Sequence, residues 1–223
     1  MIGKNCNLSR FFPFLMTILV LFYSFYGHSY QMAKHAAEAL GTKAVLKRVS
    51  ETVPRDVLEK SGALEAQKQF EHVPICTVEE LPDYTGFIIV SPTRFGNMAA
   101  QMRNFWDQTG GIWFQKKLVG KPVTAMTCTS SQGGGASTTL VSMYFTFLHH
   151  GMVVVGLPYE VEGLFLSLNL TTEMFDISQA QGGTPYGASS FTGTDGKRMP
   201  SAAELKMVEY QARHLCGIAE KLE

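Results

Sequence analysis

Short runs of apolar residues recur along the chain, and most of them lack the alternation that is typical of a strand with one exposed face. A continuous apolar run that ends at turn residues predicts a strand that is buried on both faces. The first run leads into Ser24–Ser29, and four further runs lie at 44–49, 86–92, 121–128 and 152–157. The run at 44–49 is short and more polar, which predicts an edge strand.

Segments with helical spacing separate these strands and follow the last of them, at 29–40, 54–61, 98–108, 137–149 and 201–221. Gly41 suits the left-handed turn that closes the first helix, and Ser201 with Glu204 predicts a capping box at the start of the last one. Such alternation requires right-handed crossovers and a parallel sheet with helices on both faces. The predicted fold class is therefore α/β, a doubly wound five-stranded parallel sheet with strand order 2-1-3-4-5.

The loop after the first strand, Ser24–Ser29, is rich in hydroxyls and contains Gly27. A strand–loop–helix turn directs backbone N–H groups and the positive end of the helix dipole at one point, which favours an anion of phosphate size. An ordinary strand-to-helix turn capped by Ser29 is the alternative interpretation.

Two further loops also carry candidate chemistry. Arg94 lies between Thr93 and Phe95 after the third strand, so a cation, a flat apolar surface and Gly96 occur together. A solvated arginine and a packing aromatic remain the alternative there. The fourth strand leads into a second loop of hydroxyls and glycines at 129–135. In the order 2-1-3-4-5 the loops after strands 1, 3 and 4 converge on one crevice, which predicts a ligand site.

Composition narrows the classes of function. The chain has 223 residues, 45% of them hydrophobic and 17% charged, with a formal net charge of zero. This balance lacks the basic surface expected of a nucleic-acid-binding protein. Four cysteines lie far apart without metal-ligand spacing, so reduced thiols and no metal site are predicted. No linker divides the chain, and we expect one domain over 17–223 after an extension of residues 1–16.

The N-terminal segment resembles a targeting sequence in part. Lys4 and Arg10 precede an apolar run at 11–21, but Pro13 interrupts the run and no small-residue cleavage site follows. The second half of the run is also needed as the first strand. We therefore expect a cytoplasmic protein without stable membrane anchoring. Asn7 and Asn169 lie in glycosylation acceptor patterns, which matter only if the chain is secreted.

The chain also resembles the Trp-repressor-binding-protein (WrbA-type) family of flavodoxin-like NAD(P)H:quinone oxidoreductases. The resemblance covers about residues 18–223, and its motifs occur in order. They are Ser24-Phe25-Tyr26-Gly27-His28, Pro92-Thr93-Arg94-Phe95-Gly96-Asn97-Met98, Gln101-Met102-Arg103, Asp107-Gln108-Thr109-Gly110-Gly111, Gln132-Gly133-Gly134-Gly135, His149-His150-Gly151-Met152 and Gly182-Gly183-Thr184-Pro185-Tyr186-Gly187-Ala188. The resemblance implies a flavodoxin-like fold, FMN as cofactor, NADH or NADPH as electron donor, quinones as substrates and a homotetramer.

The resemblance also implies roles for individual residues. The implied FMN-binding residues are Ser24, Phe25, Tyr26, Gly27, His28, Ser29, Thr93, Arg94, Phe95, Gly96, Cys128, Thr129, Ser130, Ser131, Gln132, Gly133 and His149. Tyr26 is also implied in NAD(P) binding, and Trp113 in substrate binding. Without the resemblance, Trp113 reads as a core or interface aromatic and His149 as a cation at a helix C-terminus. No catalytic acid or base is required, because the flavin carries the chemistry of a two-electron, ping-pong reduction.

The sequence departs from the family pattern in two places. Cys128 and Ser130 replace the serine and glycine common in the family, which predicts a loop less able to approach the flavin closely. An apolar segment at 163–172 has no recognised counterpart. Two alternatives therefore stay open, namely a flavodoxin-type electron carrier and a non-catalytic flavodoxin-like binding module. A carrier normally relies on strong charge complementarity with its partner, which a net charge of zero does not supply.

Overall fold

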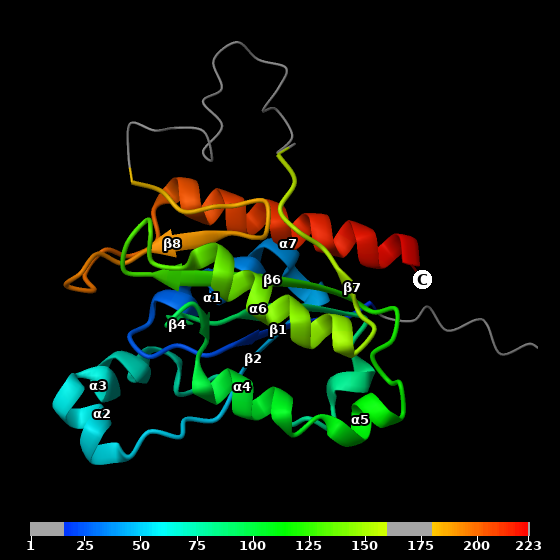
Figure 1. Ribbon diagram of the computed structural model, residues 1–223, viewed down its shortest axis with the longest axis horizontal. Coiled ribbons are helices and arrows are strands. Elements are labelled where there is room, and N and C mark those ends of the chain that lie inside the picture. The colour runs from blue at the N-terminus through cyan, green and yellow to red at the C-terminus, as the bar shows by residue number, and fades with distance from the viewer. Residues whose placement is uncertain (1–15, 160–179, 223) are drawn as a thin grey trace, which may run out of the picture.

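A computed structural model describes residues 16–159 and 180–222. Its centre is a parallel sheet with the order β2-β1-β3-β6-β7 (Figure 1), which confirms the predicted order. The strands of this path are β1 (Ile18–Phe22), β2 (Ala44–Arg48), β3 (Gly86–Val90), β6 (Pro122–Thr129) and β7 (Val153–Val154). Every residue of β1, β3 and β6 is buried, whereas β2 is half-buried. The central and edge positions expected from the apolar runs are thus confirmed.

Helices cover both faces of the sheet. They are α1 (His28–Leu40), α2 (Arg55–Ser61), α3 (Ala63–Gln67), α4 (Ala100–Asp107), α5 (Gly110–Phe114), α6 (Ala136–His149) and α7 (Ala202–Leu222). Short 3-10 helices lie at Gly41–Lys43, Lys68–Phe70 and Leu81–Asp83. One apolar core joins the sheet to α1 and α7, and the other joins it to α4 and α6. Figure 1 shows α4 and α7 on opposite sides of the sheet, as a doubly wound fold requires.

The fifth strand position is more complex than the apolar run at 152–157 predicts. Only Val153–Val154 pair with β6, beside Pro122 and Val123. The far end of β6 pairs instead with β8 (Ser189–Phe191), which lies parallel beside Thr127–Thr129. Two segments distant in the sequence therefore share one edge of the sheet. The predicted insertion at 163–172 falls between them and lies outside the described residues.

The start of α7 agrees with its capping prediction, whereas Gly41 at the end of α1 has the expected positive φ of 57° but a ψ of −127°, outside the left-handed helical region. The Ser201 N–H donates to Glu204 Oε2 at 2.8 Å, and the Glu204 N–H donates back to Ser201 Oγ at 3.2 Å. This reciprocal pair is the predicted capping box. A short antiparallel hairpin of β4 (Thr93–Arg94) and β5 (Asn97–Met98) was not expected from the sequence. Among residues 16–159 and 180–222, no helix has the length and apolarity needed to cross a membrane.

Candidate functional site

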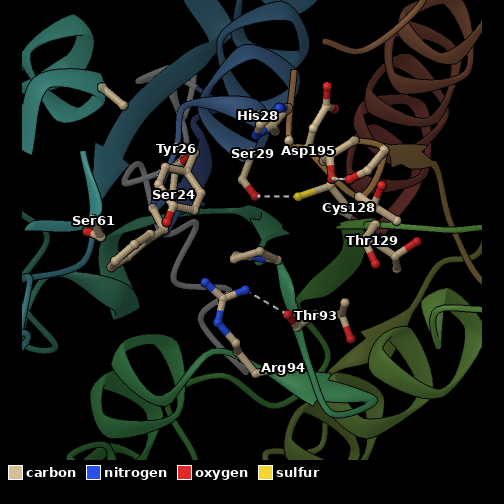
Figure 2. Close-up of a pocket in the computed structure, with 18 residues that line it drawn as sticks. Ser24, Tyr26, His28, Ser29, Ser61, Thr93, Arg94, Cys128, Thr129 and Asp195 are labelled. Carbon is tan, nitrogen blue, oxygen red and sulfur yellow. Dashed lines mark hydrogen bonds between the residues drawn. The ribbon is translucent and has the colours of Figure 1, made fainter. Parts of the chain in front are cut away.

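A crevice of about 600 Å³ opens where β1, β3 and β6 end (Figure 2). Its walls come from all three loops that the sequence singles out. The predicted residues that line it are Ser24, Phe25, Tyr26, His28, Ser29, Thr93, Arg94, Cys128, Thr129 and Ser130. The carboxyl ends of parallel strands beside a topological switch point are where ligands bind in such folds.

The loop before α1 has the geometry expected for an anion site. Gly27 has a φ of 98°, a left-handed conformation that a side chain would disfavour, and it precedes the first helical residue. Its N–H donates to Ser24 Oγ at 3.0 Å, which holds the loop closed. The first N–H groups of a helix have no partner within the helix, so those of α1 are available to a ligand here.

His28 lies at the start of α1 and lines the crevice, yet it is almost fully buried. Its Nε2 atom has no hydrogen-bond partner among the described residues. Burial lowers the pKa of the imidazole, and a hydrogen bond with the backbone of Gly196 partly opposes this effect. An unpaired polar atom beside an open crevice is therefore suited to bind a ligand atom.

Arg94 brings a cation to the opposite side of the crevice. Its Nη1 donates to the Thr93 carbonyl at 2.9 Å, and the guanidinium carbon lies 5.8 Å from the centre of the Phe25 ring. Phe95 follows with a φ of 52° and a fully exposed side chain. The tight hairpin explains this conformation, because it turns the chain back within Phe95 and Gly96. Both residues flank the crevice rather than line it.

The end of β6 contributes a buried thiol. Cys128 Sγ lies 3.3 Å from Ser29 Oγ, so the thiol contacts the α1 loop. Burial raises the pKa of Cys128. The side chain of Thr129 donates to the Ser131 carbonyl at 2.7 Å and shapes the following loop. The predicted residues Ser131, Gln132 and Gly133 are exposed in that loop and do not line the crevice.

A fourth wall was missed by the sequence analysis. Residues 192–196 follow β8 and line the crevice, and Ser61 and Ala66 add a smaller contribution from α2 and α3. The turn residues Gly193 and Gly196 around Asp195 are the signal that could have marked this loop. The predicted strand order could not have marked this loop, because β8 is separated from β6 by about 60 residues of chain.

Trp113 and His149 lie elsewhere. Both line a second hollow of about 570 Å³ between α4, α5 and α6. The indole Nε1 of Trp113 donates to the backbone carbonyl of His149 at 2.8 Å, so the two predicted residues are held together. Within one chain, neither lines the crevice.

The residues of the crevice fit FMN. A phosphate suits the N–H groups of α1 and the unpaired His28 Nε2, and the aromatic rings with Arg94 suit a planar ring. Among the described residues, no group of three His, Cys, Asp or Glu side chains could hold a metal ion.

The fold and the crevice together define the class of flavodoxin-like α/β proteins. The chain shares this fold with a flavodoxin, WrbA-like protein from Agrobacterium tumefaciens, at a TM-score of 0.59 and 17% identity over 93% of this chain and 99% of that one. It also shares it with FerB, a flavoenzyme NAD(P)H:(acceptor) oxidoreductase from Paracoccus denitrificans, at a TM-score of 0.55 and 13% identity over 92% and 98% of the two chains.

Within this class, the chain belongs to the NADPH-dependent FMN reductase family, whose pattern matches residues 16–162. A relative from Geotalea daltonii is 46% identical over 93% of this chain and 98% of its own length. One from Aromatoleum aromaticum is likewise 46% identical, over 93% and 97%. Each relative is named NAD(P)H dehydrogenase (quinone). The chain is therefore an enzyme, and its family identifies FMN as the cofactor.

Proposed function

We propose that the protein is an FMN-dependent NAD(P)H:quinone oxidoreductase of the WrbA type, which reduces quinones to hydroquinones by two electrons. The observation that carries the proposal is the crevice, in which the start of α1 and the Arg94 loop lie on opposite sides. Relatives at 46% identity over nearly the whole chain share the activity name.

The α1 loop would hold the phosphate end of FMN, with Ser24 and Ser29 supplying hydroxyls and His28 an unpaired nitrogen. When bound, FMN would supply the redox chemistry, a hydride taken from NAD(P)H and two electrons given to the quinone. Arg94 would stabilise negative charge on the ring system, because a fixed cation is most effective where charge appears during a reaction. Tyr26 is 45% exposed at the mouth of the crevice, where a nicotinamide nucleotide can contact it.

A ping-pong order is part of the proposal. The donor and the quinone would both enter through the mouth of the crevice, so the oxidised nucleotide would leave before the quinone enters. The chain has only to bind and orient the reactants, and no acid or base of its own is assigned to the reaction.

The assembly is proposed to be a homotetramer. Large apolar side chains are exposed around the second hollow, where Phe114 is 80% and Phe145 63% accessible, and such patches mark interaction surfaces. Trp113 and His149 lie beside them, so their proposed roles at a flavin require a second copy of the chain. Sedimentation of the purified protein tests this point, and a monomer at micromolar concentration would contradict it.

The proposed location is the cytoplasm. Ile18–Phe22 form the central strand β1, so this part of the apolar N-terminal run is used in the fold. Cell fractionation tests the proposal, because recovery only from detergent-extracted membranes would contradict it.

The decisive experiment mixes the flavin-loaded protein with NADH or NADPH in the absence of oxygen. A reductase loses its flavin absorbance directly and regains it when a benzoquinone is added. A flavodoxin-type carrier needs a separate reductase and is not bleached by either nucleotide. A non-catalytic module that binds no FMN gives no flavin spectrum at all.

A further inference from the structure

The loop of residues 192–196 is fixed at its base to the rest of the crevice. The Thr192 N–H donates to the Thr129 carbonyl at 2.8 Å, which joins the loop to the end of β6. The Arg198 N–H donates to the Thr192 carbonyl at 3.0 Å and closes the loop. Gly196 lines the crevice together with His28, so the tip of the loop lies near the start of α1.

A buried ion pair holds this loop in place. Glu204 is completely buried, and Arg198 Nη1 donates to its Oε2 at 2.9 Å. The same carboxylate accepts the N–H groups of Gly182 at 3.0 Å and Phe191 at 3.2 Å. Arg198 also donates to the carbonyl of Ala180 at 2.9 Å. These bonds tie the chain on both sides of the loop to the first turn of α7, and a buried charge is tolerated only with such partners.

The tip of the loop presents free backbone donors to the crevice. Within the described part of the chain, the N–H groups of Gly193, Thr194 and Asp195 donate to no protein acceptor. Gly193 has a φ of 74°, and successive N–H groups next to a left-handed residue form a concave anion site. The Asp195 side chain also lines the crevice, and its carboxylate accepts the Lys197 N–H at 3.1 Å and lies 3.8 Å from Lys197 Nζ in an exposed ion pair.

We propose that residues 192–196 form a fourth ligand-binding loop, which donates backbone N–H groups to the phosphate of FMN together with the start of α1. His28 lies at the junction and lines the crevice, and its buried Nε2 has no partner among the described residues. Figure 2 shows Asp195 on the same side of the pocket as His28 and across from Arg94, so the loop serves the phosphate end. Arg198 is a positioning residue. The inference rests on FMN being the cofactor.

The first test introduces a carboxylate at Thr194, which is exposed and lines the crevice. Thr194→Glu should raise the Kd for FMN by about tenfold, the effect of one like-charge contact at a partly solvated site. Riboflavin has no phosphate, so its Kd should change less than about twofold. Thr194→Gln is the matched neutral control and should retain the parent preference for FMN over riboflavin.

The second test loosens the loop without leaving Glu204 unpaired. Arg198→Lys keeps a positive charge beside the carboxylate but loses the forked bonds to the backbone carbonyls of Phe191 and Ala180. The ratio of the riboflavin Kd to the FMN Kd should fall about threefold. This is less than the full loss of a charge-assisted hydrogen bond would cause, because the loop is only loosened. Arg213→Lys is the control, because Arg213 binds Glu209 on the exposed side of the same helix.

The outcomes separate this inference from the proposed function. If the parent protein binds no FMN, the proposed function fails first. If the parent prefers FMN and Thr194→Glu keeps that preference, the loop does not contact the phosphate and the inference is overturned. A variant that changes only the KM for NADPH would also overturn it, since the phosphate bound there would then belong to the nucleotide donor.

Discussion

The crevice at the ends of β1, β3 and β6 and the hollow between α4, α5 and α6 are similar in size, at about 600 and 570 Å³, but they are built differently. Loops form the crevice, and the backbone at the start of α1 leaves donors free for a ligand. Side chains of α4, α5 and α6 form most of the hollow.

The two regions each contain an almost fully buried histidine. In the hollow, His150 Nε2 lies 2.9 Å from Thr109 Oγ1, whose own hydrogen is donated to the Trp106 carbonyl at 2.6 Å. Among the described residues, His150 Nδ1 has no partner, and the same is true of His28 Nε2 at the crevice. The difference therefore lies in what surrounds each histidine. His28 lies beside the free backbone donors of the crevice, which suit a small ligand, whereas the exposed aromatic rim of the hollow suits a protein surface.

The largest expected effect concerns the anion site of the crevice. Ser24→Asp places a carboxylate beside the proposed phosphate position and should weaken FMN binding by about 100-fold, the scale of a few kcal/mol for like charges. Ser24→Asn has nearly the same shape without the charge and should retain most of the affinity. Titration of each protein with FMN gives the result, and equal affinities for the two variants would show that the phosphate lies elsewhere.

A second prediction compares one arginine from each region. Arg94→Met removes the cation of the crevice and should slow flavin reduction by NAD(P)H about tenfold or more, as for the loss of one charge-stabilising group. Arg103→Met removes an arginine that lines the hollow and binds Asp107 at 2.6 Å. Stopped-flow absorbance should show nearly normal reduction for this variant. Equal rates in both would mean that Arg94 does not act on the ring.

The Trp113→Ala variant tests whether the hollow forms part of the proposed flavin site in the assembled protein. Trp113→Ala should raise the KM for a benzoquinone about fivefold, the value of one aromatic stacking contact. Reduction by NAD(P)H should change less, because the nucleotide also contacts the crevice itself. Phe114→Ala is a suitable control for a neighbouring exposed aromatic. If Trp113→Ala does not change the KM for the quinone, Trp113 does not contact the substrate and the prediction is wrong.

The smallest effect concerns the pH dependence of stability. Burial is the main cause that lowers the pKa of His150, and the nearby His149 adds to it. The unfolded chain therefore binds a proton more readily, so the stability from this histidine is present above about pH 6.5 and is lost as the pH falls. Between about pH 7 and 5, the free energy of unfolding should depend less steeply on pH in His150→Gln than in the parent. The difference in slope should be at most about 1.4 kcal/mol per pH unit.

Urea unfolding at several pH values measures that slope. His72→Gln is the control, because His72 is exposed. His28 also has a pKa lowered by burial, so His28→Gln should have the same sign as His150→Gln. A steeper dependence on pH after the His150 substitution would contradict the assignment.

The sequence by itself was sufficient for the strand order and for the first three walls of the crevice. Continuous apolar runs such as Ile18–Phe22 favour central strands, and a parallel sheet brings the loops after them to one edge. Ser24 and Arg94 come soon after such runs and Cys128 ends one, so local patterns placed them. The capping box of Ser201 and Glu204 could be predicted for the same reason, because it is a pattern within four residues.

Only the tertiary structure decided that residues 192–196 lie beside the α1 loop and that Trp113 and His149 do not. β8 has three residues and little pattern of its own, and it takes its place on β6 by pairing with Thr127–Thr129. The fourth wall follows from that pairing and from the buried bond of Arg198 to Glu204. Trp113 and His149 were separated from the crevice by the packing of α5 against α6. Contacts between distant segments depend on shape and burial over the whole chain, which no local pattern encodes.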